Sequence, residues 1–391
     1  MRLKPKFVMV ILLTALLAVI SIGLSNVDKE EVEIDEQVIE DVIPNTFCQG
    51  INNADNIPTE VLDVITNYLD DYYLSMYTLE LQDTAKYFIN EKDGQISNAA
   101  IKLIVESRKL YDFDFTMSAA HYILNVTNCT NINGKYDISF LEDDSFNFKF
   151  LNGITSEAYD IENNIVIEKV EDEYKISKYR KEQGYYTMFD DNRDDDTVEN
   201  IYAFNFNRLS KTIQNEIYNK TVAESKPYVT DKAYKLKYDR NAATLYAQTY
   251  YHSRNDKYYD FSDEGGNCQN FASQTLVQGG LQMDESGTCL WYYNNHLDYV
   301  PSWVQVPSFY EYCDENNGSG IVCDINSNIY YAEPGDLVQV GISAVSHTTI
   351  VSRVVDGHIL LNSNSIDMKD YPLEAYTQPV RKLIKILGSD S

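Results

Sequence analysis

Basic residues and cysteines are both scarce in this sequence, and each shortage argues against a class of protein. The 391 residues include 32 lysines and arginines against 60 acidic side chains, which gives a formal net charge of −28. Binding to nucleic acid, or to an anionic membrane surface through charge, requires a basic face, so we expect no nucleic-acid partner. The 6 cysteines include no C-x-x-C pair, so the sequence does not indicate a disulfide-stapled scaffold or a zinc site of that type.

Proline is also rare, whereas apolar side chains are plentiful. The chain has 9 prolines and 32 tyrosines, and 44% of its residues are hydrophobic. A sequence of this kind buries real cores and is not a disordered polyelectrolyte. Its length predicts two domains.

The first 26 residues have the pattern of an export signal. Arg2, Lys4 and Lys6 precede an unbroken apolar run of 18 residues, at positions 7–24. Such a segment directs export, and its length is also at the lower limit for a membrane-spanning helix. No A-x-A cleavage site follows, which favours a retained membrane anchor over a cleaved signal peptide. We therefore expect the rest of the chain on the extracellular face of the cell membrane, or secreted if the leader is removed.

An acidic stalk and then an α+β accessory domain are expected after this leader. Residues 27–46 contain eight acids against a single lysine and no apolar periodicity. Residues 47–189 predict helices followed by antiparallel strands. This layout resembles the cone-shaped fold of nuclear-transport-factor-like domains. The predicted helices span 58–77 and 99–110, and the predicted strands span 119–127, 135–141, 145–151, 161–169 and 173–178.

Acidic residues crowd the segment that follows. Their spacing begins like that of a calcium-binding loop, but Asp195 stands where glycine is required and Ile201 where the bidentate glutamate belongs. We therefore interpret residues 190–234 as an acidic linker that includes a helix from 197 to about 220. The second domain is expected at 235–391.

Cys268 is the candidate nucleophile of this second domain. The sequence around it predicts a loop, a helix that begins at Cys268, and a stop at Gly279 and Gly280. Asn267 is a favourable N-cap residue. Free N–H groups and the helix dipole stabilise a thiolate in a first turn, so we expect a lowered thiol pKa and a site for an oxyanion. A buried structural cysteine is the alternative.

His347 is the candidate base, because it opens a predicted strand that extends to Val355. The dipeptide Asp356-Gly357 predicts a two-residue turn into a second strand at 358–364. A histidine in a strand is more often structural than catalytic. A nearby amide side chain, together with a cysteine at a helix start, favours a catalytic role for this histidine over a structural one.

The predicted register of the two strands places such an amide beside the histidine. It pairs Val351 with Asn362, which puts Asn364 diagonal to His347 on the same face. Asn364 is therefore the better candidate to orient the imidazole, with Asn362 as the reserve. Cys268, His347 and Asn364 together form a Cys-His-Asn arrangement.

The second domain also carries a specific string of motifs. They are Tyr238-Asp239-Arg240-Asn241-Ala242-Ala243, Tyr246-Ala247, Arg254-Asn255, Tyr258, Gly265-Gly266-Asn267-Cys268, Asn270-Phe271, Ser273-Gln274, Gly279-Gly280, Met283, Trp291-Tyr292-Tyr293, Ser302-Trp303, Gly335-Asp336 and His347. With these motifs the chain resembles the putative amidase domain family of exported bacterial, mostly Gram-positive, proteins. The resemblance implies a papain-like α+β cysteine hydrolase fold, related in layout to NlpC-type cell-wall peptidases, and an amidase activity.

Two positions depart from the pattern of that family. Asn267 stands where an aspartate usually precedes the cysteine, and Asn364 stands where a histidine is common after the second strand. The first change removes a negative charge that would disfavour a thiolate. The second exchanges one orienting side chain for another that papain-like enzymes use.

The expected mechanism needs no metal and no organic cofactor. Cys268 attacks, His347 takes the thiol proton and passes it to the leaving amine, Asn364 holds the imidazole tautomer, and the Cys268 N–H contributes to an oxyanion hole. A zinc amidase is not expected, because the other histidines are not grouped with acids at ligand spacing. Those histidines include His252, His296 and His358, of which the last is expected to be solvated beside the hairpin turn.

The substrate follows only from the predicted location. A peptide or peptidoglycan-type amide fits a hydrolase on a Gram-positive cell surface. Candidate substrate or oxyanion residues are Asn267, Trp291 and Trp303, although packing is an equal interpretation for the two tryptophans. A cysteine acyltransferase with the same triad, and a catalytically silent binding or sensory ectodomain, are the alternatives. The sequence indicates no oligomeric state.

Overall fold

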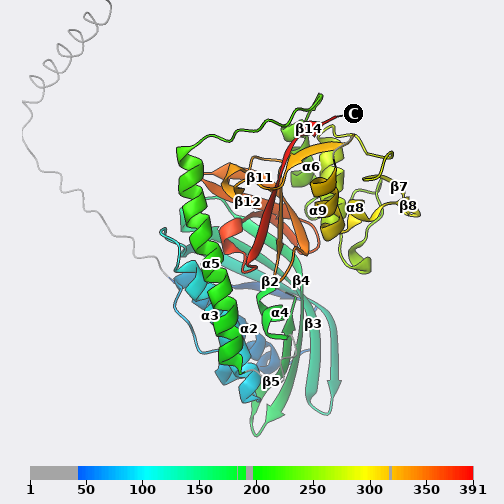
Figure 1. The fold of residues 1–391 in the computed structure, drawn as a ribbon. Helices are drawn as coiled ribbons and strands as arrows, with labels where there is room; N and C mark the ends of the chain where they lie inside the picture. The colour runs from blue at the N-terminus through cyan, green and yellow to red at the C-terminus, as the bar shows by residue number, and fades with distance from the viewer. Residues whose placement is uncertain (1–42, 183, 191–196, 317–318, 391) are drawn as a thin grey trace, which may run out of the picture. The chain divides into compact units, whose positions relative to one another are not determined.

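The computed structural model describes residues 43–182, 184–190, 197–316 and 319–390 (Figure 1). The predicted leader at 1–26, most of the predicted stalk at 27–46 and the acid-rich residues 191–196 lie outside these ranges. None of the helices that the described residues form is long and apolar enough to cross a membrane. Export and anchoring therefore stay predictions.

The first half of the fold consists of helices followed by long antiparallel strands, as the sequence predicts. Apolar side chains recur at helical spacing on the first long helix and are buried in the core between helix and sheet. They include Tyr68, Leu69, Tyr72 and Met76. The elements are β1 (Cys48–Asn52), α2 (Thr59–Thr78), α3 (Glu91–Arg108), β2 (Met117–Ile132), β3 (Lys135–Phe148), β4 (Ser156–Val170) and β5 (Glu173–Lys181). The sheet is mixed, because β1 pairs with β2 in parallel.

Strand β1 was not among the predicted strands, and β3 also differs from the prediction. The segments 135–141 and 145–151 were predicted as separate strands, but β3 continues through the intervening acids to Phe148. Asp144 is buried there and accepts a hydrogen bond from Tyr73. Glu142 is buried as well, 2.8 Å from the Lys181 ammonium. Because these partners satisfy the buried acids, the acidic pattern does not mark a turn.

Two helices connect the halves of the fold. They are α4 (Gly184–Asp190) and α5 (Val198–Ser225). The prediction of a helix from residue 197 is confirmed, and the Thr197 side chain caps α5 by accepting from the Asn200 N–H. On α5 the buried Glu216 carboxylate lies 2.7 Å from the Arg381 guanidinium of the last strand. This ion pair joins the connecting helix to the second half.

The second half contains short helices and the remaining strands of the sheet. Its helix α7 begins at Cys268, as predicted. The helices are α6 (Arg240–Tyr250), α7 (Cys268–Gln278), α8 (Pro301–Val304) and α9 (Val306–Glu315). The strands are β6 (Leu236–Lys237), β7 (Tyr293–Asn295), β8 (Asp298–Tyr299), β9 (Ile321–Asp324), β10 (Leu337–Gly341), β11 (His347–Val355), β12 (His358–Ser363), β13 (Asp367–Pro372) and β14 (Val380–Ser389).

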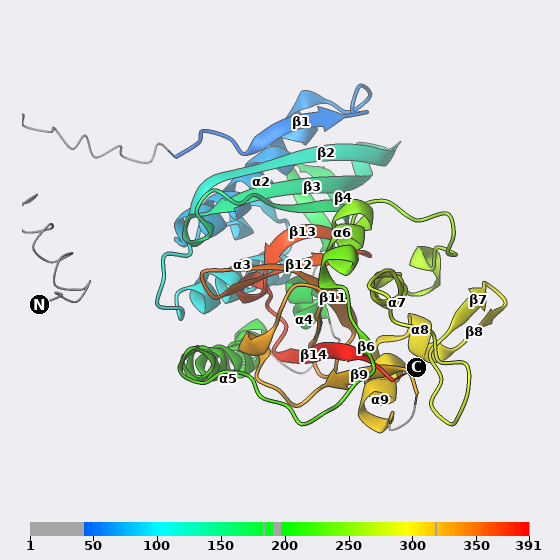
Figure 2. The ribbon, with the colours of Figure 1, turned by 90° about the horizontal axis from the view of Figure 1, so that it is seen from above.

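One sheet runs through both halves (Figure 2). Its strand order is β1-β2-β3-β4-β13-β12-β11-β10-β14-β6, with β5 on β4 and β9 on β14. The junction is the antiparallel pairing of β4 with β13, in which Asp367 lies opposite Tyr159. The sheet therefore crosses the predicted boundary between an accessory domain at 47–189 and an amidase domain at 235–391, and that division stays a prediction.

Helices α6 and α7 cover one face of the second half of the sheet. Asn362 of β12 donates to the Ala247 carbonyl of α6, and Thr348 of β11 donates to Gln269 of α7. The loop and short 3-10 helix between β13 and β14 (Leu373–Ala375) pack on the opposite face, in a separate apolar cluster with Val351. One face of β11 therefore packs against α7, and the other packs against the segment between β13 and β14.

Candidate active site

Cys268 lies at the N-terminal end of α7. Its side chain is buried, with 7% of the residue exposed. Gly265 and Gly266 precede it with φ angles of 105° and 116°, a left-handed conformation that glycine adopts without strain. This turn places the thiol at the N-terminal end of α7, where the first backbone N–H groups have no partner within the helix.

Burial raises the pKa of the Cys268 thiol, although backbone hydrogen bonds at Thr348, Gln269 and Cys268 itself oppose the rise. Hydrogen bonds that lower a thiol pKa stabilise the thiolate, so they come from N–H donors. The expected net lowering of the pKa is therefore wrong, because desolvation outweighs the helix end. The raised pKa favours the neutral thiol over the thiolate.

Asn267 occupies the predicted N-cap position, but its side chain does not cap the helix. Its Oδ1 accepts from the Phe261 backbone N–H at 3.2 Å and from the Asn270 side-chain Nδ2 at 2.7 Å. Its Nδ2 donates to Asn364 Oδ1 at 2.7 Å. The side chain therefore fixes the loop before Cys268, and the expectation of a capping hydrogen bond is wrong.

Asn364 is fully buried and holds this loop from the other side. Besides the bond to Asn267, its Nδ2 donates to the carbonyls of Tyr250 and Tyr251 at 3.1 and 3.2 Å. Among the described residues, no hydrogen bond joins Asn364 to His347. Its amide thus links the end of α6 to the loop before Cys268, instead of holding the imidazole as the sequence predicts.

A bulge between β11 and β12 explains this difference. Asn362 lies opposite Ile350, not opposite Val351 as predicted, because the register shifts after the turn. A shift of one residue moves a side chain to the other face of a sheet. As a result, Asn362 and Asn364 face α6, and His347 does not share their face.

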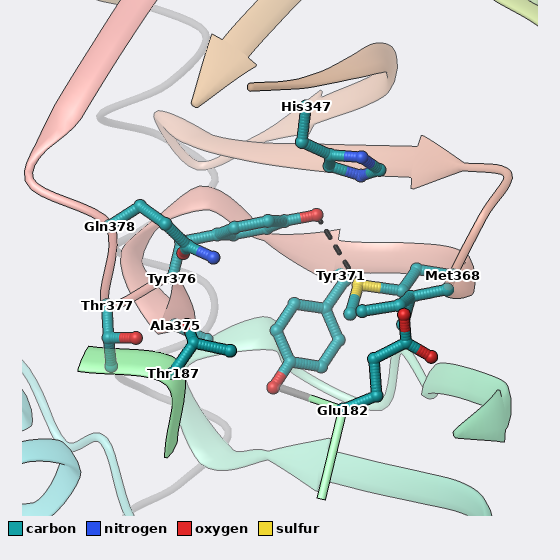
Figure 3. A pocket seen from close by; sticks show the side chains of 10 residues that line it. Glu182, Thr187, His347, Met368, Tyr371, Ala375, Tyr376, Thr377 and Gln378 are labelled. Atoms are coloured by element: carbon teal, nitrogen blue, oxygen red, sulfur yellow. Dashed lines mark hydrogen bonds between the residues drawn. The ribbon is translucent and has the colours of Figure 1, made fainter. Parts of the chain in front are cut away.

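The pairing of β11 with β10 shows where His347 points. His347 lies opposite Val340, and Thr348 lies opposite Gln339. Paired residues share a face, and the Thr348 hydroxyl donates to Gln269 of α7 at 2.7 Å. Thr348 therefore faces α7, and the His347 side chain points away from α7. His347 lines a cavity on the opposite face, as Figure 3 shows for the residues around that cavity.

Cys268 nevertheless contacts the backbone next to His347 at the start of β11. The Thr348 amide that stabilises a Cys268 thiolate directly follows His347 in the chain. The pairing of β11 with β12 ends at Ile350, so β12 does not pair with the strand at this point. Burial lowers the pKa of His347 to about 4, which leaves its imidazole neutral at pH 7. No direct hydrogen bond between thiol and imidazole occurs among the described residues.

A strained turn that the sequence did not reveal borders both groups. Ser365 and Ile366 have φ angles of 75° and 66°, a conformation that costs a β-branched residue about 1–3 kcal/mol. The Ser365 hydroxyl accepts a hydrogen bond from the Asn267 N–H, and Ile366 lines the cavity beside His347. Only this long-range contact, which no local motif indicates, identifies the turn as part of the site.

Trp291 and Trp303 lie in the core behind α7 and are fully buried. Their indole N–H groups donate to Ser273 and Asn270 of α7, at 3.1 and 2.7 Å. The two rings stack with centroids 5.2 Å apart. The structure therefore favours packing over the walls of a substrate groove for both tryptophans.

His252 has acidic neighbours, contrary to expectation. Its Nδ1 lies 3.3 Å from an Asp367 oxygen and 3.8 Å from an Asp160 oxygen. The three side chains offer possible ligand atoms within 4.8 Å of one another. Arg254 already contacts Asp367 at 3.1 Å and would repel a cation, so we assign no metal to this group.

His358 is also placed differently from the expectation. It is buried instead of solvated, and its Nδ1 lies 2.9 Å from Glu374. Phe113 and Phe150 pack around its ring. His358 is therefore a core residue with a satisfied polar group.

Comparison with known proteins supports the resemblance noted in the sequence. Residues 237–386 match the family described as Putative amidase domain. The chain is also 32% identical over 158 residues to the Uncharacterized protein YhbB of Bacillus subtilis (strain 168). That alignment covers 37% of this chain and 49% of the relative, so the chain spans about half of the relative's length. No solved structure matches the chain, and the papain-like layout stays a prediction.

Replacing Asn364 with alanine tests whether this residue positions the loop before Cys268. We expect a loss of about 1–3 kcal/mol in unfolding free energy, because buried partners lose their hydrogen bonds, and a lower kcat/KM with an unchanged pH profile. Urea unfolding and initial rates measure both. Asn362→Ala is the matched control, since Asn362 is equally buried but bonds Ala247 and Asp370. A changed pH profile in Asn364→Ala alone would instead support a contact with the imidazole.

Proposed function

We propose that the second half of the chain is a cysteine-dependent amidase. The observation that carries this proposal is the position of Cys268 at the start of α7, among N–H donors that include the amide next to His347. The match of residues 237–386 to the putative amidase domain family supports it.

The chemistry starts from a neutral thiol and a neutral imidazole. Sγ of Cys268 attacks the carbonyl carbon of the substrate amide while His347 accepts the thiol proton. The N–H groups at the start of α7 hold the oxyanion of the tetrahedral intermediate. His347 then gives the proton to the leaving amine, and a thioester to Cys268 remains until water hydrolyses it. Because the His347 side chain points to the opposite face, direct transfer requires it to reach Cys268 around the start of β11, beyond the last pair of β11 with β12.

We further propose that the protein acts outside the cell, on peptide amides such as those of peptidoglycan stem peptides. The positively charged and apolar leader at 1–26 supports this location. The net charge of −28 favours neutral or cationic substrates over anionic ones.

One observation favours a catalytically silent binding ectodomain instead. The His347 side chain points to the face opposite α7, and the structure contains no thiol–imidazole hydrogen bond among the described residues. An ectodomain that only binds its partner needs no proton transfer between Cys268 and His347, so this arrangement would not impair its function.

A substrate screen separates these functions. The full-length chain is incubated with peptide amides and with purified peptidoglycan fragments, and the products are identified by mass spectrometry. We expect release of an amine that stops in Cys268→Ser. Transfer of the acyl group to added hydroxylamine in place of water would identify an acyltransferase, and the absence of any Cys268-dependent product would support the silent ectodomain.

A further inference from the structure

A cavity of about 250 Å³ lies beside His347 on the face of the sheet opposite α7 (Figure 3). Its wall is largely apolar and aromatic, formed by Ile366, Met368, Tyr371, Ala375 and Tyr376. The Tyr376 hydroxyl donates to the sulfur of Met368 at 3.4 Å, so its own polar group is satisfied within the wall. The space therefore suits an apolar group.

The size of the cavity limits what it can hold. Pockets that enclose a whole drug-sized ligand have volumes of roughly 300–1,000 Å³. A space of about 250 Å³ instead accommodates one side chain of a larger molecule.

The position of the cavity connects it to the nucleophile. Ile366 is part of its wall, and the preceding residue, Ser365, accepts a hydrogen bond from the Asn267 N–H next to Cys268. His347 is part of the wall as well. The turn at Ser365 and Ile366 therefore borders both the cavity and the loop before Cys268.

Polar groups at the cavity are suited to a peptide backbone and an amine. The side-chain Oε1 of Gln378 is buried and has no hydrogen-bond partner among the described residues, so it is available to accept from a substrate N–H. Glu182 contributes a carboxylate near Met368 (Figure 3).

The first half of the chain contributes this acidic side of the cavity. Glu182 directly follows β5, and Thr187 of α4 also lines the space. The half that precedes the amidase match therefore takes part in the site.

We propose that this cavity is a specificity pocket for an apolar side chain of the peptide substrate, in which Gln378 accepts a backbone N–H and Glu182 favours a nearby cationic group. The proposal rests on the proposed amidase function and names its substrate class: peptides with a leucine- or phenylalanine-sized side chain next to the scissile amide and a free amine within reach. The two halves of the chain form the pocket together.

Pocket variants of the full-length chain test this proposal with peptide amides that carry Gly, Ala, Leu or Phe beside the scissile bond. We expect kcat/KM for Leu or Phe to exceed that for Gly by at least about 10-fold. Ala375→Leu fills the pocket and should remove the preference. Met368→Ala enlarges it and should shift the preference toward Phe. The matched control is Met283→Ala, because Met283 is also partly buried and accepts a hydrogen bond at 3.4 Å, but lies outside the pocket.

The charge of the pocket is tested separately. Glu182→Gln should lower kcat/KM about 2- to 5-fold for a peptide with a free amine and leave its acetylated form unchanged. Glu173→Gln is the matched control, since it removes the same charge at the other end of β5.

Binding to Cys268→Ala separates failure of the pocket from failure of the amidase. Titration calorimetry with the Leu and Gly peptides should give tighter binding of the Leu peptide, lost in Cys268→Ala combined with Ala375→Leu. Cys268-dependent hydrolysis without a preference that Met368→Ala or Ala375→Leu alters would overturn the pocket alone. An absence of hydrolysis with selective binding would overturn only the amidase. An absence of both would overturn both proposals.

Discussion

Cys268→Ala is expected to lower kcat/KM for amide hydrolysis by at least about 1,000-fold, because removal of a covalent nucleophile leaves only binding and oxyanion stabilisation. The fold should persist, since alanine fits the first turn of α7 and the loop is held by Asn267 and Asn364. Initial rates with a peptide amide, and circular dichroism for the fold, measure the two effects.

The matched control for this substitution is Cys313→Ala. Cys313 lies on α9 and is as buried as Cys268, with 6% against 7% exposed. It should retain the activity of the original chain. Equal losses in both variants would show that the effect of Cys268→Ala comes from a damaged core and not from a missing nucleophile.

His347→Ala is expected to lower kcat/KM by about 10²- to 10⁴-fold, the usual contribution of a general base. In the original chain, activity should fall with decreasing pH through about 4, where the His347 imidazole becomes protonated and can no longer accept the thiol proton. An imidazole with an ordinary pKa would place this fall near pH 6.5. The pH dependence of kcat/KM between 3.5 and 8 distinguishes the two, given a stable fold.

His358→Gln is the control for the pH profile, because His358 is a buried histidine of β12 that contacts Glu374 outside the site. Its acid limb should stay where it is in the original chain. A limb centred near pH 6.5 in the original chain would contradict the lowered pKa of His347. Unchanged activity of His347→Ala would contradict its role as the base.

Local sequence patterns predicted the parts of the site that depend on local structure. The start of α7 at Cys268 and the hairpin between Val355 and His358 are both confirmed. Each depends on a few neighbouring residues: glycines before the helix, and Asp356-Gly357 with φ angles of 50° and 77° at the turn. The motifs of the putative amidase domain likewise lie within residues 237–386.

How these elements pair with one another could not be predicted, because it depends on long-range contacts that no local pattern contains. The bulge in β11 occurs at Ser352, whose hydroxyl donates to the Leu360 carbonyl and to Asp370 of β13. Arg353 reinforces the same contact, 2.7 Å from Asp370. Because the position of β13 was unknown from the sequence, the register after the turn was predicted without the bulge. That single residue decides which face His347 occupies.

The junction of the two halves was unpredictable for the same reason. Pairing of β4 with β13 joins residues about two hundred positions apart, and alternation along each strand specifies a buried face but no partner. The contribution of Glu182 to a pocket beside His347 follows only from this long-range pairing.

The most direct test of the account is to trap the acyl-enzyme. The full-length chain is mixed with a peptide amide, quenched in acid within milliseconds, digested and analysed by mass spectrometry. The account predicts a thioester on the peptide that contains Cys268, with a mass increase equal to the acyl group of the substrate. Turnover of the amide with no acyl group on Cys268 at any time would contradict it.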